Sequence, residues 1–190
     1  MQSESAVRSH SPKLQEIAKT IRITGWIAFW VQLAFAVVSS LALLFAATGR
    51  GFTNQPSRGL GAGIFWAILG IIVLFFSIYW DFLYMRKGRF LANPNPVLHP
   101  SKADTVRAIK LGVVASVIGI LLTLFGLGST VGVLVAKSIS QPPGVAITDP
   151  NKIIRALDVF VLVANVNGIA GHFVGLLAAL WLFIRIDHNP

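Results

Sequence analysis

The stretch VFVLVANVNGIAGHFVGLLAALWLF, from Val159 to Phe183, decides the fold class of this chain. It contains no Asp, Glu, Lys or Arg, and as a helix rising about 1.5 Å per residue it can cross the roughly 30 Å hydrocarbon core of a bilayer. Lipid offers no partners for backbone N–H and C=O groups, and the alternation typical of barrel strands is absent. The stretch therefore predicts a transmembrane helix, interrupted only by Asn165, Asn167 and His172.

Three further apolar runs precede this one. The predicted spans cover approximately residues 23–47, 60–84, 111–136 and 159–184. We therefore expect an all-α integral membrane protein, with four transmembrane helices in a bundle. The domains would be a basic tail (1–22), the four-span membrane domain (23–184) and a short C-terminal tail (185–190). The composition agrees, since 55% of residues are hydrophobic and 12% are charged, about half the charged share of a soluble domain.

Basic residues outnumber acidic ones, with 16 Lys and Arg against 7 Asp and Glu and a net charge of +9. They lie in short connections between apolar runs, which indicates anionic lipid headgroups and topology control rather than nucleic acid. Eleven fall on the side of both termini and five on the other, which predicts cytoplasmic termini. The eleven are Arg8, Lys13, Lys19, Arg22, Arg86, Lys87, Arg89, Lys102, Arg107, Lys110 and Arg185; the five are Arg50, Arg58, Lys137, Lys152 and Arg155.

The tail segment SPKLQEIAKTIRI, Ser11–Ile23, has the pattern of an amphipathic helix. Ser11 is a suitable N-cap and Pro12 suits the first helical position. One face would carry Leu14, Ile17, Ala18 and Ile21. We expect an interfacial helix lying on the anionic cytoplasmic leaflet, and the alternative is a cytoplasmic extension of the first span.

The connection between the second and third spans, NPNPVLHPSKAD (Asn93–Asp104), is interrupted by proline. Proline disfavours a helix before Ser101, and Ser101 can cap a new helix that has Asp104 in its first turn. We expect that helix to lead into the third span.

The sequence lacks residues and motifs that several classes of function require. It has no cysteine and therefore no disulfide, thiolate metal site or cysteine nucleophile. No Ser/His/Asp, metal-spaced His or phosphate-loop pattern stands out, so we expect neither an enzyme nor a bound cofactor. The polar start of the chain lacks the apolar core of a cleaved signal peptide, so we expect none.

Small residues form a seam along the third span. Gly112, Ser116, Gly119, Thr123 and Gly126 are spaced four, three, four and three residues apart, which places them within roughly 80° of one another on a helix. Another helix can approach closely along such a seam. The seam predicts a tightly packed bundle and a surface for assembly, and it does not indicate conduction.

The fourth span carries a polar face. Asp158, Asn165 and His172 are seven residues apart and drift only about 20° per heptad, whereas Asn167 points to the opposite side. Gln32 is a polar group within the first span, and a four-helix bundle could bring it to Asn165 or Asn167 and to His172 near its axis. We expect the fourth span to be buried among helices on both sides.

Two interpretations of these polar groups stay open. In the first they hydrogen-bond across helices, each contact contributing roughly 0.6 to 2 kcal/mol. In the second, an intramembrane ionisable residue marks a path for a substrate, ion or proton. His172 can titrate near neutral pH, and it is the candidate metal-contacting residue together with Asp158 at the outer mouth. The lack of cysteine and the presence of only 2 methionines favour a hard or borderline ion.

Two carboxylates near span ends are expected to form local ion pairs. Asp158 follows Arg155 by three residues, a spacing at which helical side chains meet. Asp81 lies near Arg86 and Lys87, close to the inner headgroups. We expect pairing rather than catalysis at both positions.

Three segments resemble a known family of membrane proteins. They are FWVQL (Phe29–Leu33), STVGVLVAKSIS (Ser129–Ser140) and ALDVFVLVANVNGIAGHFVGL (Ala156–Leu176). The family is that of the chloroplast inner-envelope protein described both as a twenty-one-kilodalton translocon component and as the permease in chloroplasts. It has cyanobacterial members without a transit peptide, which this chain resembles from about Ser11 onward, and the resemblance implies four spans with termini on the stromal side.

The resemblance implies two rival functions: transport of iron or another metal ion, or a part in preprotein import. The family's motif positions that are present here are Gln32, Lys137, Asp158, Asn167 and His172. The chain departs from the chloroplast members at Val163, where they carry Gln, and at Asn165, where they carry a smaller polar residue.

Our first expectation is a metal-ion permease of the cyanobacterial plasma membrane or thylakoid that works as a homo-oligomer. The alternative is a translocon or scaffold subunit of a membrane complex, without transport activity alone.

Overall fold

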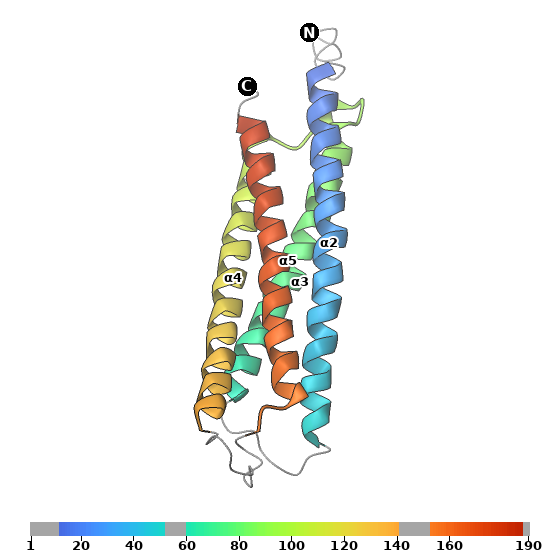
Figure 1. Cartoon of the computed structure of the whole chain (residues 1–190). Helices are drawn as coiled ribbons and strands as arrows, with labels where there is room; N and C mark the ends of the chain where they lie inside the picture. The colour runs from blue at the N-terminus through green and yellow to red at the C-terminus, as the bar shows by residue number, and fades with distance from the viewer. Residues whose placement is uncertain (1–11, 52–59, 141–152, 188–190) are drawn as a thin grey trace. The chain divides into compact units, whose positions relative to one another are not determined.

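Long helices dominate the structure, a computed structural model that describes residues 12–51, 60–140 and 153–187 (Figure 1). The helices are α2 (Pro12–Gly51), α3 (Leu60–Leu91), α4 (Lys102–Ile139) and α5 (Ala156–Asp187), and a short 3-10 helix, η1 (Pro96–Leu98), lies between α3 and α4. The all-α fold class predicted from the sequence is confirmed.

Each of the four long helices has the length and apolar composition needed to cross a membrane, so the prediction of four spans is confirmed. The predicted spans lie within these helices, which continue beyond them at one end or both. Large apolar side chains such as Trp26, Leu44, Phe65 and Phe125 are exposed on the helices. Exposed apolar surface on this scale is typical of a protein that contacts lipid tails.

The basic tail does not form a separate interfacial helix. α2 runs without interruption from Pro12 to Gly51, so residues 12–22 are its first turns, as in the alternative that the sequence left open. Ser11, the proposed N-cap, lies outside the described residues. The apolar face of these turns is covered by protein, because Ile21 is buried in a cluster that includes Ile186. Packing on neighbouring helices therefore takes the place of the lipid contact expected from the amphipathic pattern.

The chain divides into two compact units, and each contains a segment of all four long helices. The first unit comprises Met1–Leu33, Phe75–Val117 and His172–Pro190, and the second comprises Ala34–Leu74 and Ile118–Gly171. Each unit has its own apolar cluster and its own buried polar side chains.

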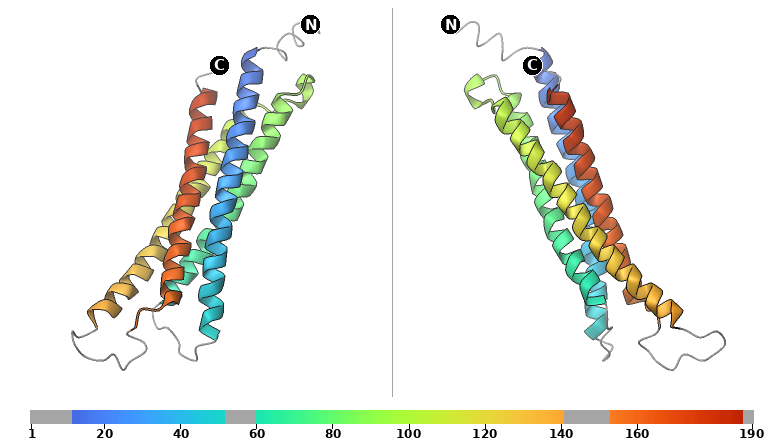
Figure 2. Two further views of the ribbon diagram at one scale, coloured as in Figure 1. Left: turned by 45° about the vertical axis from the view of Figure 1, so that its right-hand side comes forward. Right: turned by 90° about the vertical axis from the view of Figure 1, so that its left-hand side faces the viewer.

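The core of the first unit lies where the beginnings of α2 and α4 meet the ends of α3 and α5 (Figure 2). Its buried members are Ile21, Tyr84, Ala108, Ile109, Ala179, Leu182 and Ile186. Two aromatic side chains share one carbonyl acceptor there: Trp80 Nε1 donates to Ala108 O at 2.7 Å and Tyr84 Oη donates to it at 3.4 Å. These bonds let polar aromatic atoms be buried between α3 and α4 without losing their partners.

α4 begins with the cap that the sequence predicts. Ser101 Oγ accepts a hydrogen bond from Asp104 N at 3.0 Å and donates one to Asp104 Oδ2 at 2.6 Å. The helix starts at the next residue, Lys102. A serine cap and an acidic first turn both satisfy or complement the free N–H groups of a helix start, and the expected cap is confirmed.

Small residues let the helices of the second unit approach closely. Its apolar cluster contains Ala42, Leu43, Ala67 and Ala164. Gly70 of α3 and Gly168 of α5 both face Thr123 of α4, and a Cβ at Gly168 would lie 2.8 Å from Thr123 Cγ2. Thr123 Oγ1 donates to Gly119 O of its own helix at 2.8 Å, which leaves the threonine methyl group to fill the space beside the two glycines.

Candidate functional site

A buried amide and a buried carboxyl group meet in the first unit. Gln32 of α2 is 0% exposed, and its Nε2 donates a hydrogen bond to Asp81 Oδ2 of α3. Gly175 of α5 leaves room for this arrangement, since a Cβ there would lie 2.9 Å from Gln32 Nε2 and 3.0 Å from Ser77 Oγ. Three helices therefore converge on Gln32, Ser77 and Asp81, which we call the amide–carboxyl cluster.

Asp81 is not paired with Arg86 or Lys87, and the expectation of a local ion pair is wrong here. Asp81 is 2% exposed and faces α2. Arg86 lies over the ring of Phe90 at 5.4 Å, and Lys87 Nζ donates to Asp104 O at 3.2 Å. At about 100° per residue, positions five and six residues further along a helix point roughly 140° and 240° away, so the two bases lie on other faces of α3.

His172 belongs to the same unit as the amide–carboxyl cluster. It lies on α5 and is 0% exposed. Residues three apart share a helix face, so His172 lies on the side of α5 that presents Gly175 to Gln32 and Ser77. The first unit thus contains two of the residues predicted for the polar site.

The second unit contains a buried ion pair. Lys137 Nζ, at the end of α4, donates to Asp158 Oδ2, in the first turn of α5. The side chains are only 8% and 0% exposed. The same carboxylate oxygen accepts a hydrogen bond from Arg155 N at 3.1 Å, and Asp158 N donates to Arg155 O at 3.0 Å. Asp158 is therefore both a cap of α5 and the counter-ion of Lys137.

This arrangement differs from the expected side-chain pair between Asp158 and Arg155. The carboxylate accepts from the backbone N–H of Arg155 because an acidic side chain at the third helical position folds back over the helix start. Its cation comes from another helix, at Lys137.

Asn165 is fully buried against two other helices of the second unit. Its Nδ2 donates to Val161 O of α5 at 2.9 Å and to Gly63 O of α3 at 3.4 Å. A Cβ at Gly126 of α4 would collide with Asn165 Oδ1 and would lie 2.8 Å from Asn165 Cγ. Glycines of two helices therefore form the walls of the space that holds this amide.

Asn167 is half-buried, and its Nδ2 donates to Val163 O one turn earlier, at 2.9 Å. The amide nitrogen therefore has its partner within its own helix. The predicted polar site is distributed over two units, with Gln32 and His172 in the first and Asp158, Asn165 and Asn167 in the second.

Three fully buried oxygens of amide or carboxylate side chains accept no hydrogen bond from the residues that the structure describes. They are Gln32 Oε1, Asn165 Oδ1 and Asp158 Oδ1. Each belongs to a side chain whose other polar atom is engaged, which fixes the orientation of both amides. Buried acceptors usually find a donor, and oxygens of this kind are the ligands that hard cations prefer.

The described residues contain no group of three or more His, Asp or Glu side chains that could hold a metal ion together. The two candidate metal contacts, His172 and Asp158, belong to different units.

The seam of α4 faces protein. Gly112, Ser116, Gly119, Thr123 and Gly126 are all buried. In the first unit a Cβ at Gly112 would collide with Tyr84 Oη, and in the second Thr123 and Gly126 contact glycines or amides of α3 and α5. These small residues allow the large or polar side chains opposite them to be buried.

Sequence reasoning missed the roles of Asp81, Ser77 and Lys137. A signal for the first two was present, because a carboxyl group one turn after a serine within an apolar run marks a polar helix face. The resemblance named Lys137 as a motif position but gave it no role, and its partner lies 21 residues away on another helix.

Comparison with known proteins confirms the resemblance seen in the sequence. Residues 11–187 match the family described as "Protein of unknown function (DUF3611)". The chain is also similar to "Protein TIC 21, chloroplastic" of Arabidopsis thaliana, with 31% identity over 182 residues that cover 90% of this chain and 60% of the relative. The chain thus spans less than two thirds of that relative's length. No solved structure matches the chain. With four helices able to span a bilayer and such a relative, the chain is an integral membrane protein.

Proposed function

The chain belongs to the DUF3611 family, and from this premise we propose that it is a transport protein that carries a metal ion, such as iron, across a membrane. The observation that carries the proposal is the set of buried amide and carboxylate oxygens that have no donor among the described residues: Gln32 Oε1, Asn165 Oδ1 and Asp158 Oδ1. Buried oxygens between helices that lack donors favour the binding of a cation over that of an anion.

Single oxygen acceptors of this kind suit passage of an ion rather than its tight storage. Conduction requires sites that bind an ion strongly enough for it to enter and weakly enough for it to leave. In this proposal Asp158 attracts the cation at the outer mouth, and the Lys137 ammonium neutralises it when no ion is bound. Gln32, Asn165 and His172 then provide transient polar contacts deeper in the spans, and the lack of thiolates favours a hard or borderline ion.

The proposal includes an orientation, an assembly and a location. The basic residues favour cytoplasmic termini, as the charge asymmetry of the connections predicts. Four helices barely enclose a path, so we propose a homo-oligomer. The membrane would be the plasma membrane or thylakoid of a cyanobacterium, or the inner envelope in a plastid.

Flux into liposomes tests this function. Purified protein would be reconstituted alone, and uptake of iron(II), manganese(II) and protons followed with fluorescent reporters. Asn165→Leu removes one oxygen at similar size, and we expect flux per folded molecule to fall about tenfold, the loss that corresponds to roughly 1.4 kcal/mol. Gln15→Leu, at an exposed amide of α2, is the control and should leave flux unchanged. If the unaltered protein carries none of the three ions, the transport proposal is wrong.

A scaffold or translocon subunit is the second candidate. The observation that favours it is the close fit of Asn165 and Thr123 against glycines of neighbouring helices, which is what a purely structural role requires. This alternative predicts that Asn165→Leu lowers thermal stability and abundance, and that flux is absent before and after the change.

A further inference from the structure

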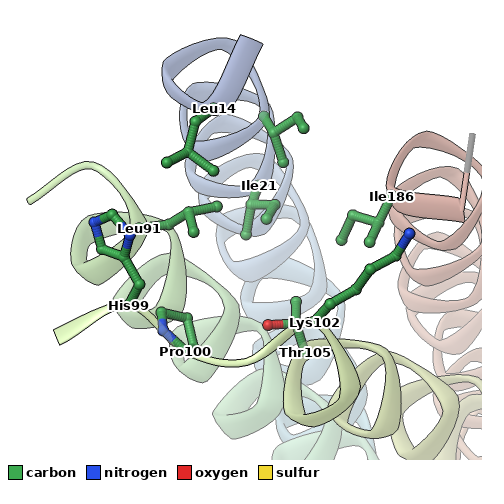
Figure 3. A pocket seen from close by; sticks show the side chains of 9 residues that line it. Leu14, Ile21, Leu91, His99, Pro100, Lys102, Thr105 and Ile186 are labelled. Atoms are coloured by element: carbon green, nitrogen blue, oxygen red, sulfur yellow. The ribbon is translucent and has the colours of Figure 1, made fainter. Parts of the chain in front are cut away.

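A cavity and a groove lie beside the contact between α2 and α3 in the first unit. The cavity has a volume of about 330 Å³ and apolar walls that include Leu14, Ile21 and Ile186 (Figure 3). Its polar side chains already have partners: His99 Nε2 lies 2.8 Å from Asn93 O, Thr105 Oγ1 donates to Ser101 O at 3.0 Å, and Lys102 is also engaged. This cavity therefore offers apolar surface but little uncommitted charge.

The groove differs from this cavity because it is lined by basic side chains. Two hollows of about 270 and 330 Å³ share Arg22 as a lining residue. We call them together the basic groove, whose charged side chains are Lys19 and Arg22 of α2 and Arg89 of α3. Among the residues that the structure describes, no acidic side chain lines either hollow.

The backbone contact at Gly88 forms the floor of the basic groove. A Cβ at Gly88 would lie 3.0 Å from Ala18 O and 3.1 Å from Arg22 N, so the two helices touch there. Lys19 and Arg22 are three residues apart and share one face of α2, and Arg89 follows Gly88 directly. The three charged side chains are therefore held beside one another by a close helix contact.

These three charges lack counter-ions. Lys19, Arg22 and Arg89 are exposed, and none forms an ion pair with a residue that the structure describes. Glu16, an acidic side chain of the same helix end, pairs instead with Arg185. Like charges gathered without counter-ions raise the local potential, and an anion bound among them relieves it.

The groove is also apolar on one side. Ile23, Trp26 and Met85 line it together with Arg22 and Arg89, and Trp26 is 57% exposed. Tryptophan prefers the membrane–water interface, and arginine pairs with phosphate through parallel hydrogen bonds. A soluble anion would use the charges alone, whereas a phospholipid would use both sides of the groove.

We propose that the basic groove is a binding site for the headgroup of an anionic phospholipid. The phosphate lies between Arg22 and Arg89, Lys19 extends the positive surface toward the aqueous side, and the upper acyl chains lie against Ile23 and Trp26. Basic pockets between membrane helices bind anionic headgroups by this chemistry.

Native mass spectrometry of the delipidated full chain in detergent tests the site. Phosphatidylglycerol and phosphatidylcholine would be titrated separately, and the bound fraction measured. Arg22→Gln combined with Arg89→Gln should weaken phosphatidylglycerol binding about 25-fold, because each basic residue near an anionic surface contributes roughly a factor of five. The charge-matched control, Arg107→Gln combined with Lys110→Gln, changes two exposed residues of α4 outside the groove and should change binding less than about twofold.

The outcomes separate the alternatives. A selective loss in the groove variant, with binding restored by Arg22→Lys combined with Arg89→Lys, supports a local headgroup site. Equal losses in both double variants would show only general charge attraction, and unchanged binding in both would show that the lipid sits elsewhere. Displacement of phosphatidylglycerol by millimolar inorganic phosphate would identify a soluble anion as the occupant. Each of these three results overturns the proposal, and a thermal melt of every variant shows whether it is folded.

Discussion

The two units bury a carboxyl group in different ways. In the first unit Asp81 meets the neutral amide of Gln32, and in the second Asp158 meets the ammonium group of Lys137. Both carboxyl groups are at most 2% exposed, and both lie on helices that are otherwise apolar. The same side chain is therefore accommodated once by an amide and once by an ion pair.

This difference indicates how each unit responds to change. Removing one member of a buried ion pair leaves a charge without compensation, which is among the most costly changes in a protein. Removing an amide from a hydrogen-bonded pair loses one directional contact. The second unit should therefore be the more sensitive of the two to a single polar substitution.

The largest effect is expected for Lys137→Met. It leaves Asp158 buried without its cation and should destabilise the protein by about 3–5 kcal/mol, measured by thermal or denaturant unfolding in detergent. Replacing both partners, with Lys137→Met and Asp158→Leu, should recover most of the loss. If the single variant is as stable as the unaltered protein, the second unit is not the more sensitive of the two to a polar substitution.

A smaller effect is expected where glycines face the two buried amides. Gly126→Ala places a methyl group against Asn165 in the second unit and should cost about 2 kcal/mol. Gly175→Ala should cost about 1 kcal/mol, because Gln32 and Ser77 present only the ends of their side chains at 2.9 and 3.0 Å. The control is Gly128→Ala, where nothing lies within 4 Å and alanine should be neutral or stabilising in the same melts. A larger loss for Gly175 than for Gly126 would reverse the proposed order.

A loss similar to that of Gly175→Ala is expected for Gln32→Leu in the first unit. It removes the amide donor of Asp81 and should destabilise by roughly 1 kcal/mol, less than Lys137→Met. Gln15→Leu, at an exposed glutamine of the same helix, should change stability by less than about 0.5 kcal/mol. A loss at Gln32 as large as that at Lys137 would show that the amide–carboxyl cluster behaves as a charged pair.

The sequence predicted the spans and the Ser101 cap because each depends on neighbouring residues alone. It revealed the buried face only where small or polar residues mark one, as along the seam of α4 and at Asn165 and His172 of α5. Elsewhere the helices are apolar all round and show no contrast between lipid and protein. Asp81 illustrates this, because its partner Gln32 is 49 residues away and only the packing of α2 on α3 brings them together. The same holds for Lys137 and Asp158, and for the tail, whose apolar face packs on helices rather than on lipid.

The length of α2 has a consequence for the water-exposed part of the molecule. Its 40 residues make a rod of about 60 Å, whereas a bilayer with its headgroups is about 40–45 Å thick. Part of this helix therefore stands in the aqueous phase. Its first turns are packed against α3 and α5, because Ile21 is buried in one cluster with Tyr84 and Ile186. The start of α2 is thus held by protein contacts as well as by the membrane-spanning part of the same helix.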